Sequence, residues 1–160
     1  MKQTAVYPGT FDPVTYGHMD VIKRVAGLYN RVYVAVAHSA QKNTLFSVKE
    51  RVEMLNEAVS EYENIIVEDF NGLVVDYATS KSAKVVIRGL RMISDFEYEF
   101  QMALTNRKLN PGIETVFMMP NESYSYLSSR LIKEAALMGA DISKFVPPNV
   151  QKKLRGAFAR

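Results

Sequence analysis

Four polar loops carry the residues most able to do chemistry, and the first of these loops ends in a histidine. In the run PGTFDPVTYGH, Gly9 and Gly17 permit backbone to approach a ligand closely, and Thr10 and Thr15 offer hydroxyl groups. His18 falls in the first turn of an expected helix, where free backbone amides attract anions. A lone histidine is more often a solvated residue and Thr15 alone would be a plain helix cap, but the combination predicts a phosphate site.

The other three loops add cations and hydroxyls of the same kind. Lys42 stands in the polar stretch HSAQKNTLFS, Arg88 and Arg91 follow the apolar run VVI, and Ser128 and Ser129 stand where a later helix should begin. Guanidinium groups match phosphate oxygens and stay charged at any working pH, and serines at a helix start form an anion cradle. A surface lysine and plain helix caps are the simpler alternatives, but together these groups favour a polyphosphate over an acyl group.

A structural ion pair is the alternative role for the two arginines, with Asp95, Glu97 or Glu99 as the partner. Glu99 lies eight residues after Arg91, which is about two helical turns. We therefore expect Glu99 to hold an arginine or a ribose hydroxyl rather than to act as a base. Two nearby aromatic residues are expected either to pack or to edge a nucleobase pocket: Tyr124 and Tyr126.

Several common chemistries lack their residues in this chain. There is no cysteine, no GK[ST] phosphate loop and no GxGxxG dinucleotide fingerprint. Asp12, directly before Pro13, is interpreted as a turn residue, and no cluster of carboxylates suggests a metal cage built by the protein. Any Mg²⁺ is therefore expected to arrive with the nucleotide.

These loops require a scaffold that brings them to one edge, and the hydrophobic pattern predicts one. Short β-branched runs alternate with stretches of helical period, which indicates right-handed crossovers and a parallel sheet with helices on both faces. We expect one doubly wound, Rossmann-like α/β domain over residues 1–160, with its ligand beyond the carboxyl ends of the strands. The five strands are expected at Lys2–Tyr7, Arg31–Ala37, Asn64–Glu68, Ala83–Ile87 and Ile113–Met118.

The helices between these strands are amphipathic. Ser47 and Glu50 match a capping box at the start of the second helix, and Gly139 is expected to end the helix after the fifth strand. Pro147 and Pro148 should begin a last helix. The long helix Ile93–Leu109 is expected to turn four apolar residues toward the core: Phe96, Phe100, Ala103 and Leu104.

Composition fits a compact globule and narrows the range of partners. The chain has 160 residues, 48% of them hydrophobic, with a net charge of +3 that is too mild to indicate nucleic-acid binding. The chain shows no charged-then-apolar leader and no apolar run of about 20 residues, so a cytoplasmic location without a membrane partner is expected. The basic residues near the C-terminus suit a solvated helix end better than a polyanion contact: Lys152, Lys153, Arg155 and Arg160.

Taken together, the motifs resemble a known family. TYGH resembles the T/HxGH signature of the nucleotidyltransferase α/β phosphodiesterase superfamily, and SSRLIKE resembles its second, serine-rich signature. More narrowly, YPGTFDPVTYGH, VIRGLR followed by DFEYE, and SSxxxKE resemble the bacterial phosphopantetheine adenylyltransferases over essentially the whole chain. The chain departs from many members at Arg130, where they have a third serine, and at Leu127, where they have isoleucine.

The resemblance implies reversible transfer of the AMP moiety of ATP to phosphopantetheine, giving dephospho-coenzyme A and pyrophosphate. It also implies Mg²⁺ bound to the ATP, a homohexamer built as a dimer of trimers, and coenzyme A as a feedback ligand. The implied catalytic residues are His18, which would stabilise the transition state, and Lys42, which would meet the acceptor phosphate. Phosphopantetheine contacts are implied for Thr10, Lys42, Val74 and Arg88. ATP contacts are implied for Thr10, Phe11, His18, Gly89, Leu90, Arg91, Glu99, Tyr124, Ser125, Tyr126, Leu127, Ser128, Ser129 and Arg130.

Three alternatives stay open on the sequence. The first is a related nucleotidyltransferase with another acceptor, such as nicotinate mononucleotide or glycerol phosphate, against which the RGLR and DFEYE segments argue. The second is a nucleotide-binding regulator of flavodoxin-like shape. The third is a nucleic-acid-binding module that uses the basic tail, whose affinity would fall steeply with salt.

Overall fold

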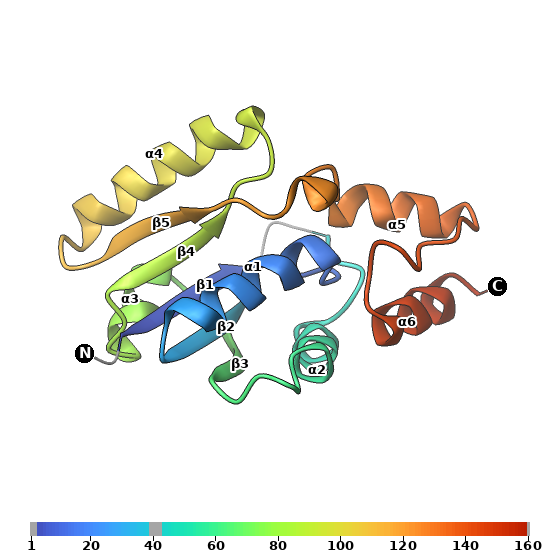
Figure 1. Cartoon of the computed structure of the whole chain (residues 1–160), viewed down its shortest axis with the longest axis horizontal. Coiled ribbons are helices and arrows are strands. Elements are labelled where there is room, and N and C mark those ends of the chain that lie inside the picture. The colour runs from blue at the N-terminus through green and yellow to red at the C-terminus, as the bar shows by residue number, and fades with distance from the viewer. Residues whose placement is uncertain (1–2, 39–42, 160) are drawn as a thin grey trace.

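A five-stranded parallel sheet forms the centre of the protein (Figure 1). The computed structural model describes residues 3–38 and 43–159. The strand order is β3-β2-β1-β4-β5, so the direction of winding reverses between β1 and β4, as a doubly wound α/β fold requires. The predicted fold class is confirmed. The strands are β1 (Thr4–Gly9), β2 (Arg31–Ala37), β3 (Ile65–Phe70), β4 (Val85–Gly89) and β5 (Glu114–Met118).

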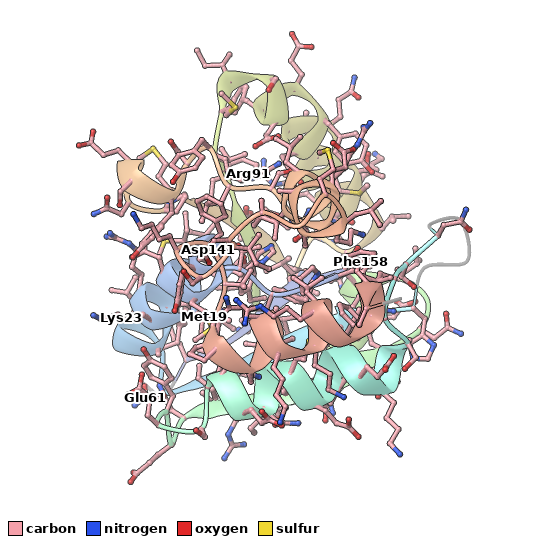
Figure 2. The ribbon with its side chains drawn as sticks, turned by 90° about the vertical axis from the view of Figure 1, so that its right-hand side faces the viewer. Met19, Lys23, Glu61, Arg91, Asp141 and Phe158 are labelled. Atoms are coloured by element: carbon pink, nitrogen blue, oxygen red, sulfur yellow. The ribbon has the colours of Figure 1, made fainter. Side chains whose placement is uncertain are left out.

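Six α-helices and one short 3₁₀ helix connect and follow these strands in the described part of the chain. The last two α-helices, α5 and α6, lie beyond the carboxyl ends of the strands, and α6 runs alongside α2 (Figures 1 and 2). The helices are α1 (Tyr16–Leu28), α2 (Val48–Ala58), α3 (Val74–Ser80), α4 (Ile93–Leu109), η1 (Glu122–Tyr124), α5 (Ser129–Leu137) and α6 (Pro148–Phe158). None of the described helices is long and apolar enough to cross a bilayer.

Helix ends follow the local signals in the sequence. Ser47 and Glu50 form the predicted capping box, in which each side chain bonds the backbone amide of the other residue. Gly139 has a φ of 81° just after α5, a conformation that glycine adopts without strain. Pro147 caps α6 and Pro148 is its first residue, where the missing amide costs nothing.

A larger hydrophobic core covers one face of the sheet and a smaller one covers the other. Ala5 and Tyr7 of β1 belong to the larger buried cluster, which joins the sheet to α1, α2, α5 and α6. Val6 of the same strand points the other way, into a smaller cluster that includes Val75 and Ala78 of α3. Because alternate residues of a strand face opposite sides, the continuous apolar sequence of β1 is explained by burial on both faces.

Three strands reach further toward the site than predicted. The strands β1, β3 and β4 end at Gly9, Phe70 and Gly89, two residues beyond the expected ends in each case. The ladder between β1 and β4 covers only Ala5 and Val6, after which the carbonyl of Pro8 accepts a hydrogen bond from Arg88 instead. The two strands are therefore not paired with each other at their carboxyl ends, which opens a crevice at the point where the strand order reverses.

The predicted inward face of α4 is wrong. Phe96, Phe100 and Leu104 are 45%, 47% and 45% exposed, and the buried residues of the helix are Glu99 and Asn106, two turns apart. The helix has apolar residues around most of its circumference, so periodicity alone does not select a face. The face turned toward the sheet carries Glu99, whose carboxylate pairs with Arg88 of β4. In Figure 1, α4 lies above β4 and β5 with its other side uncovered.

Candidate active site

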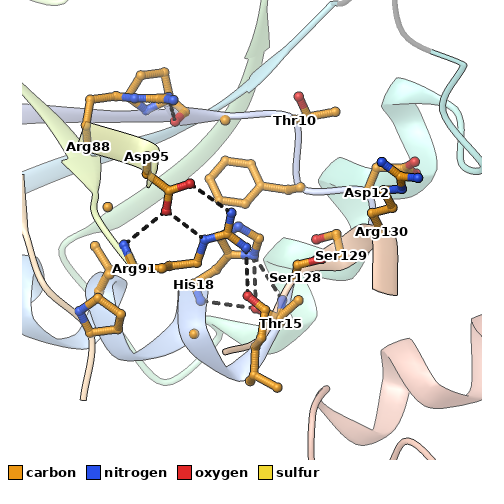
Figure 3. A pocket seen from close by; sticks show the side chains of 18 of the residues that line it. Thr10, Asp12, Thr15, His18, Arg88, Arg91, Asp95, Ser128, Ser129 and Arg130 are labelled. Atoms are coloured by element: carbon orange, nitrogen blue, oxygen red, sulfur yellow. Dashed lines mark hydrogen bonds and ion pairs between the residues drawn. The ribbon is translucent and has the colours of Figure 1, made fainter. Parts of the chain in front are cut away.

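A pocket of about 390 Å³ occupies the crevice between the carboxyl ends of β1 and β4. Its wall comes from four segments far apart in the sequence, which are the end of β1 with the start of α1, the loop before α2, the end of β4 with α4, and the start of α5. Figure 3 shows the close grouping of side chains from these segments. The sequence-predicted residues that line the pocket are Thr10, Phe11, His18, Arg88, Gly89, Arg91, Glu99, Leu127, Ser128, Ser129 and Arg130.

His18 is the third residue of α1 and takes part in that helix's cap. Its backbone amide donates to the Thr15 hydroxyl at 3.3 Å, and its ring Nδ1 accepts from the Thr15 backbone amide at 3.1 Å. The TYGH motif is thus a capping box in which histidine replaces the usual glutamate. Since Nδ1 accepts a hydrogen bond, the proton of the neutral ring lies on Nε2, which makes Nε2 a donor.

The surroundings of His18 keep the imidazole neutral. Burial, assisted by the positive charges of Arg91 and Arg88, lowers the pKa of His18 from 6.5 to about 4. At neutral pH the ring therefore carries one proton, on Nε2, and has no lone pair left to accept a proton from a substrate. This geometry suits a hydrogen-bond donor to an anion and does not suit a general base.

Phe11 fixes the first loop and explains its glycine. Phe11 is buried with a φ of 49°, in the left-handed region that non-glycine residues rarely adopt. Its ring meets the His18 ring edge-on, with centroids 5.0 Å apart. A Cβ on Gly9 would lie 3.0 Å from two carbons of the Phe11 ring, so any larger residue would have to displace that ring. The loop thereby holds the imidazole from both sides, by Thr15 and by Phe11.

Arg88 and Glu99 form a two-pronged ion pair inside the pocket. Arg88 Nε donates to Glu99 Oε2 at 2.8 Å and Arg88 Nη2 donates to Glu99 Oε1 at 2.6 Å, while Nη1 donates to the Pro8 carbonyl at 3.0 Å. These bonds use three of the five N–H groups of the guanidinium and leave two for a ligand. Glu99 thus holds an arginine, one of the two roles expected from the sequence.

Arg91 lines the pocket and bonds two of its neighbouring segments. Its Nη1 donates to the Leu127 carbonyl at 2.8 Å, and its Nε lies 3.3 Å from Asp95 Oδ2. In Figure 3 the Asp95 carboxylate faces the Arg91 guanidinium beside His18. Arg91 thereby links the end of β4 to the segment that precedes α5.

The start of α5 provides the second helix N-terminus of the site. The Ser128 hydroxyl accepts from the Leu131 amide at 3.1 Å as a helix cap, and the Ser129 hydroxyl donates to the Pro13 carbonyl at 2.8 Å. The Arg130 side chain is 87% exposed and pairs with Glu134 along the helix surface. The two serines are therefore engaged with backbone, and their helix presents its remaining amides to the pocket.

The other predicted residues lie elsewhere. Lys42 falls outside the described residues. Val74 packs against the smaller core under α3 and does not line the pocket. Four further predicted residues are also absent from the wall of the described pocket: Leu90, Tyr124, Ser125 and Tyr126.

Three charged residues of the site were missed as functional candidates. Asp12 is only 4% exposed and accepts a hydrogen bond from Lys133 Nζ at 2.7 Å, and Arg51 is 2% exposed behind the first loop. Asp12 does lie in a turn, as its place before Pro13 predicts, but the pattern gives no sign of these contacts. A signal for Lys133 is present in the sequence, since it lies four residues after Ser129 and so on the same helical face. The sequence carries no comparable signal for Arg51.

The carboxylates that line the pocket already have cationic partners. Asp12 pairs with Lys133, Asp95 with Arg91, and Glu99 with Arg88. Among residues 3–38 and 43–159, no group of three or more histidine, aspartate or glutamate side chains is placed to hold a metal ion. The described pocket thus holds four cationic side chains against three carboxylates, and the N–H groups that these ion pairs leave free suit phosphate oxygens.

Comparison with known proteins agrees with this chemistry. A family described as Cytidylyltransferase-like matches residues 6–135. The chain is 51% identical to the phosphopantetheine adenylyltransferase of Caldanaerobacter subterraneus subsp. tengcongensis over 99% of each chain. It is 54% identical to that of Alkaliphilus metalliredigens over 91% of this chain and 92% of the relative.

A solved structure confirms the fold at much lower identity. The nicotinic acid mononucleotide adenylyltransferase of Plasmodium falciparum, complexed with NaAD, superposes with a TM-score of 0.74 at 14% identity, covering 98% of this chain and 96% of that one. At this identity the likeness concerns the fold alone. The sequence relationship is far closer, and by it the chain belongs to the phosphopantetheine adenylyltransferase family of cytidylyltransferase-like nucleotidyltransferases.

Proposed function

We propose that the pocket transfers the adenylyl group of ATP to the phosphate of phosphopantetheine, with His18 as a neutral donor to the α-phosphate. The chain is a nucleotidyltransferase of coenzyme A biosynthesis, whose products are dephospho-coenzyme A and pyrophosphate. The role of His18 as a donor is supported by its neutral imidazole. Its Nδ1 accepts a hydrogen bond from the Thr15 backbone amide, and its pKa is lowered to about 4.

The reaction does not require a general base. A phosphate monoester is already an anionic nucleophile near neutral pH, since its second pKa is about 6. One of its oxygens attacks the α-phosphorus in line, the bond from the α-phosphorus to the bridging oxygen breaks, and pyrophosphate leaves with the electron pair. What the protein supplies is position and stabilisation of charge on oxygens. Nε2–H of His18 is suited to stabilise charge on the α-phosphate.

The two substrates meet at the Arg88–Glu99 ion pair. Arg88 is proposed to bind the phosphate of phosphopantetheine through its two remaining N–H groups, and Glu99 to contact ATP. Because the guanidinium and the carboxylate are bonded at 2.6 and 2.8 Å, the two half-sites are adjacent. The Arg91 guanidinium and the N-terminus of α5 are proposed to bind the ATP phosphates.

The remaining contacts are proposed from the family resemblance. Lys42 is proposed to meet the acceptor phosphate and the charge that develops during transfer. Thr10 is proposed to contact both the α-phosphate of ATP and phosphopantetheine, and Val74 to touch the pantetheine arm. Adenine and the outer phosphates are proposed to contact the segment from Tyr124 to Arg130. Mg²⁺ is proposed to enter bound to the ATP phosphate oxygens, because the pocket carboxylates in the described part of the chain are already paired with cations. When bound, the ion supplies further neutralisation of phosphate charge.

An acceptor panel tests this function. Purified protein is incubated with ATP and Mg²⁺ and, in turn, phosphopantetheine, nicotinate mononucleotide and glycerol phosphate, and pyrophosphate release is measured. We expect release with phosphopantetheine and a kcat/KM at least about 100-fold lower with the other two, since they lack the pantetheine arm. Preferential turnover of nicotinate mononucleotide would refute the proposed acceptor. ATP binding without pyrophosphate release from any acceptor would refute the transferase role.

Self-association is proposed as well. Besides Phe96 and Phe100, α4 exposes Ile93 and Tyr98, so this helix carries an apolar surface that a monomer would leave in water. We propose that this surface contributes to a homohexamer, a dimer of trimers, that binds coenzyme A as a feedback ligand in the cytoplasm. Sedimentation equilibrium should give six times the chain mass of 18.1 kDa, and a mass of one chain at micromolar concentration would contradict it.

A further inference from the structure

The Asp12 carboxylate is bonded to two other segments of the site at once. Its Oδ1 accepts from the Phe46 amide at 2.9 Å, and its Oδ2 accepts from the Leu45 amide at 2.8 Å and from Lys133 Nζ at 2.7 Å. Asp12 itself belongs to the loop between β1 and α1, directly after Phe11. A single buried carboxylate therefore joins two loops and helix α5, which converge on the pocket.

The loop before α2 depends on Asp12 for its placement. Asn43 and Thr44 of this loop line the pocket, and the next two amides are the ones that Asp12 accepts. A second buried charge holds the same loop from behind. Arg51 donates to the carbonyls of Phe46 at 3.2 Å and Thr10 at 2.7 Å, and so links this loop to the first one.

The position of helix α5 also depends on the Asp12 carboxylate. Lys133 lines the pocket one helical turn after Ser129, and its side chain is 24% exposed. An ammonium group has three donors, of which Asp12 takes one. The ion pair therefore fixes the ammonium at the pocket wall, and α5 is tied to the first loop at two points, since the Ser129 hydroxyl also bonds the Pro13 carbonyl.

We propose that Asp12 is a positioning residue that holds the loop before α2 and helix α5 in fixed relation, so that the acceptor half and the ATP half of the site form together. The inference rests on the proposed function, which assigns the start of α5 to ATP and assigns Lys42, directly before Asn43 in the sequence, to the acceptor. It goes beyond that function because it makes binding of both substrates depend on one residue that is not assigned to either.

Substitution by asparagine tests this junction with little change in shape. Asparagine offers one acceptor oxygen and places an NH₂ group where the carboxylate had a second acceptor, so it cannot satisfy two backbone amides and an ammonium group together. We expect Asp12→Asn to raise the KM for ATP and the KM for phosphopantetheine, each by roughly 5- to 20-fold, a scale typical of losing a charge-assisted hydrogen bond. A purely structural role would reduce the amount of active enzyme, lowering kcat per total protein while leaving both KM values unchanged.

A second variant separates the two arms of the junction. Lys133→Gln removes only the contact to α5, on a side chain that is partly exposed and therefore tolerant of change. We expect it to raise the KM for ATP and to leave the KM for phosphopantetheine within about twofold of wild type. If Asp12→Asn fails to fold, this variant still tests the proposal, since an unchanged KM for ATP would overturn it.

Glu68→Gln serves as a matched control. Glu68 is a partly buried carboxylate that accepts from Tyr77 Oη at 2.7 Å and pairs with Lys81, and it lies on β3 away from the pocket wall. Both KM values should match wild type in this variant. Unchanged KM values in Asp12→Asn, or a change in only one of them, would overturn the proposal. Wild-type protein without activity toward phosphopantetheine would instead refute the proposed function, so the two failures are distinguishable.

Discussion

Removal of the His18 imidazole should slow adenylyl transfer without unfolding the protein. The imidazole is neutral and its Nε2–H is a donor, because Thr15 occupies Nδ1 and the pKa is lowered to about 4. Loss of one preorganised donor to a developing charge costs about 10²- to 10³-fold in kcat. We expect His18→Ala to show this loss in kcat with a smaller change in the KM for ATP.

The lowered pKa of His18 also determines which fraction of the imidazole is charged at a given pH. A shift from 6.5 to about 4 makes protonation of the folded protein about 3 kcal/mol harder than protonation of the unfolded chain. At pH 6, only about one imidazole in a hundred would be charged, whereas an ordinary histidine would be mostly charged. His18 therefore stays a single-proton donor over the range in which the enzyme is expected to work.

The pH dependence of the reaction rate does not report the pKa of His18 separately, because the acceptor phosphate also titrates near pH 6. The chain has two histidines, so His38→Gln leaves His18 as the one remaining imidazole. His38 bonds Asp69 at 2.5 Å and does not line the pocket, so this variant should keep wild-type kinetics. Nitrogen-15 NMR of the free variant then gives both the titration midpoint and the tautomer.

The expected midpoint lies below pH 5, with the neutral ring protonated on Nε2. A midpoint at pH 6 or above, or a ring protonated on Nδ1, would refute the capping geometry as the source of the donor. An unchanged kcat in His18→Ala would refute the role itself. Circular dichroism of His18→Ala checks that any loss of activity does not come from unfolding.

Three further predictions concern stability. The unfolded chain binds a proton at His18 more readily than the folded protein does, so the free energy of unfolding should fall by up to about 3 kcal/mol as pH drops from 6.5 to 4, and urea titrations should show a smaller fall in His18→Gln. Gly9→Ala should cost about 1–3 kcal/mol by the same measurement, since its Cβ meets the buried Phe11 ring at 3.0 Å; an unchanged midpoint would contradict that packing. Arg51→Met should lower the free energy of unfolding by about 3–5 kcal/mol, because the carbonyls of Thr10, Ala37 and Phe46 lose their buried donor, and a loss under 1 kcal/mol would show that water replaces it.

The order of strands and helices could be predicted because it depends on local pattern. β-branched runs, the Ser47 capping box and Gly139 act within a few residues, and each appears where the sequence places it. The parallel sheet then follows from the alternation of elements and the handedness of crossovers. Strand ends were predicted less well, since the length of β1 depends on what its neighbours pair with and not on its own residues.

The face of α4 could not be predicted, because its apolar residues surround the helix. Glu99 turns inward to pair with Arg88, eleven residues earlier on the preceding strand, and the apolar residues are left outside. A helix that is apolar on most sides follows its strongest partner, and here that partner is a buried guanidinium. The exposed apolar surface of α4 is the consequence.

The sequence by itself determined that phosphate-binding groups gather at one sheet edge, because TYGH, RGLR and SSRLIKE each follow a strand. Only the tertiary structure decided how they are held. Asp12 meets Leu45 and Lys133 across 33 and 121 residues, and Arg51 reaches Thr10 across 41. Such contacts depend on how loops converge once the sheet has formed. A carboxylate that the sequence marks only as a turn residue thereby becomes the junction of two loops and helix α5 in the fold.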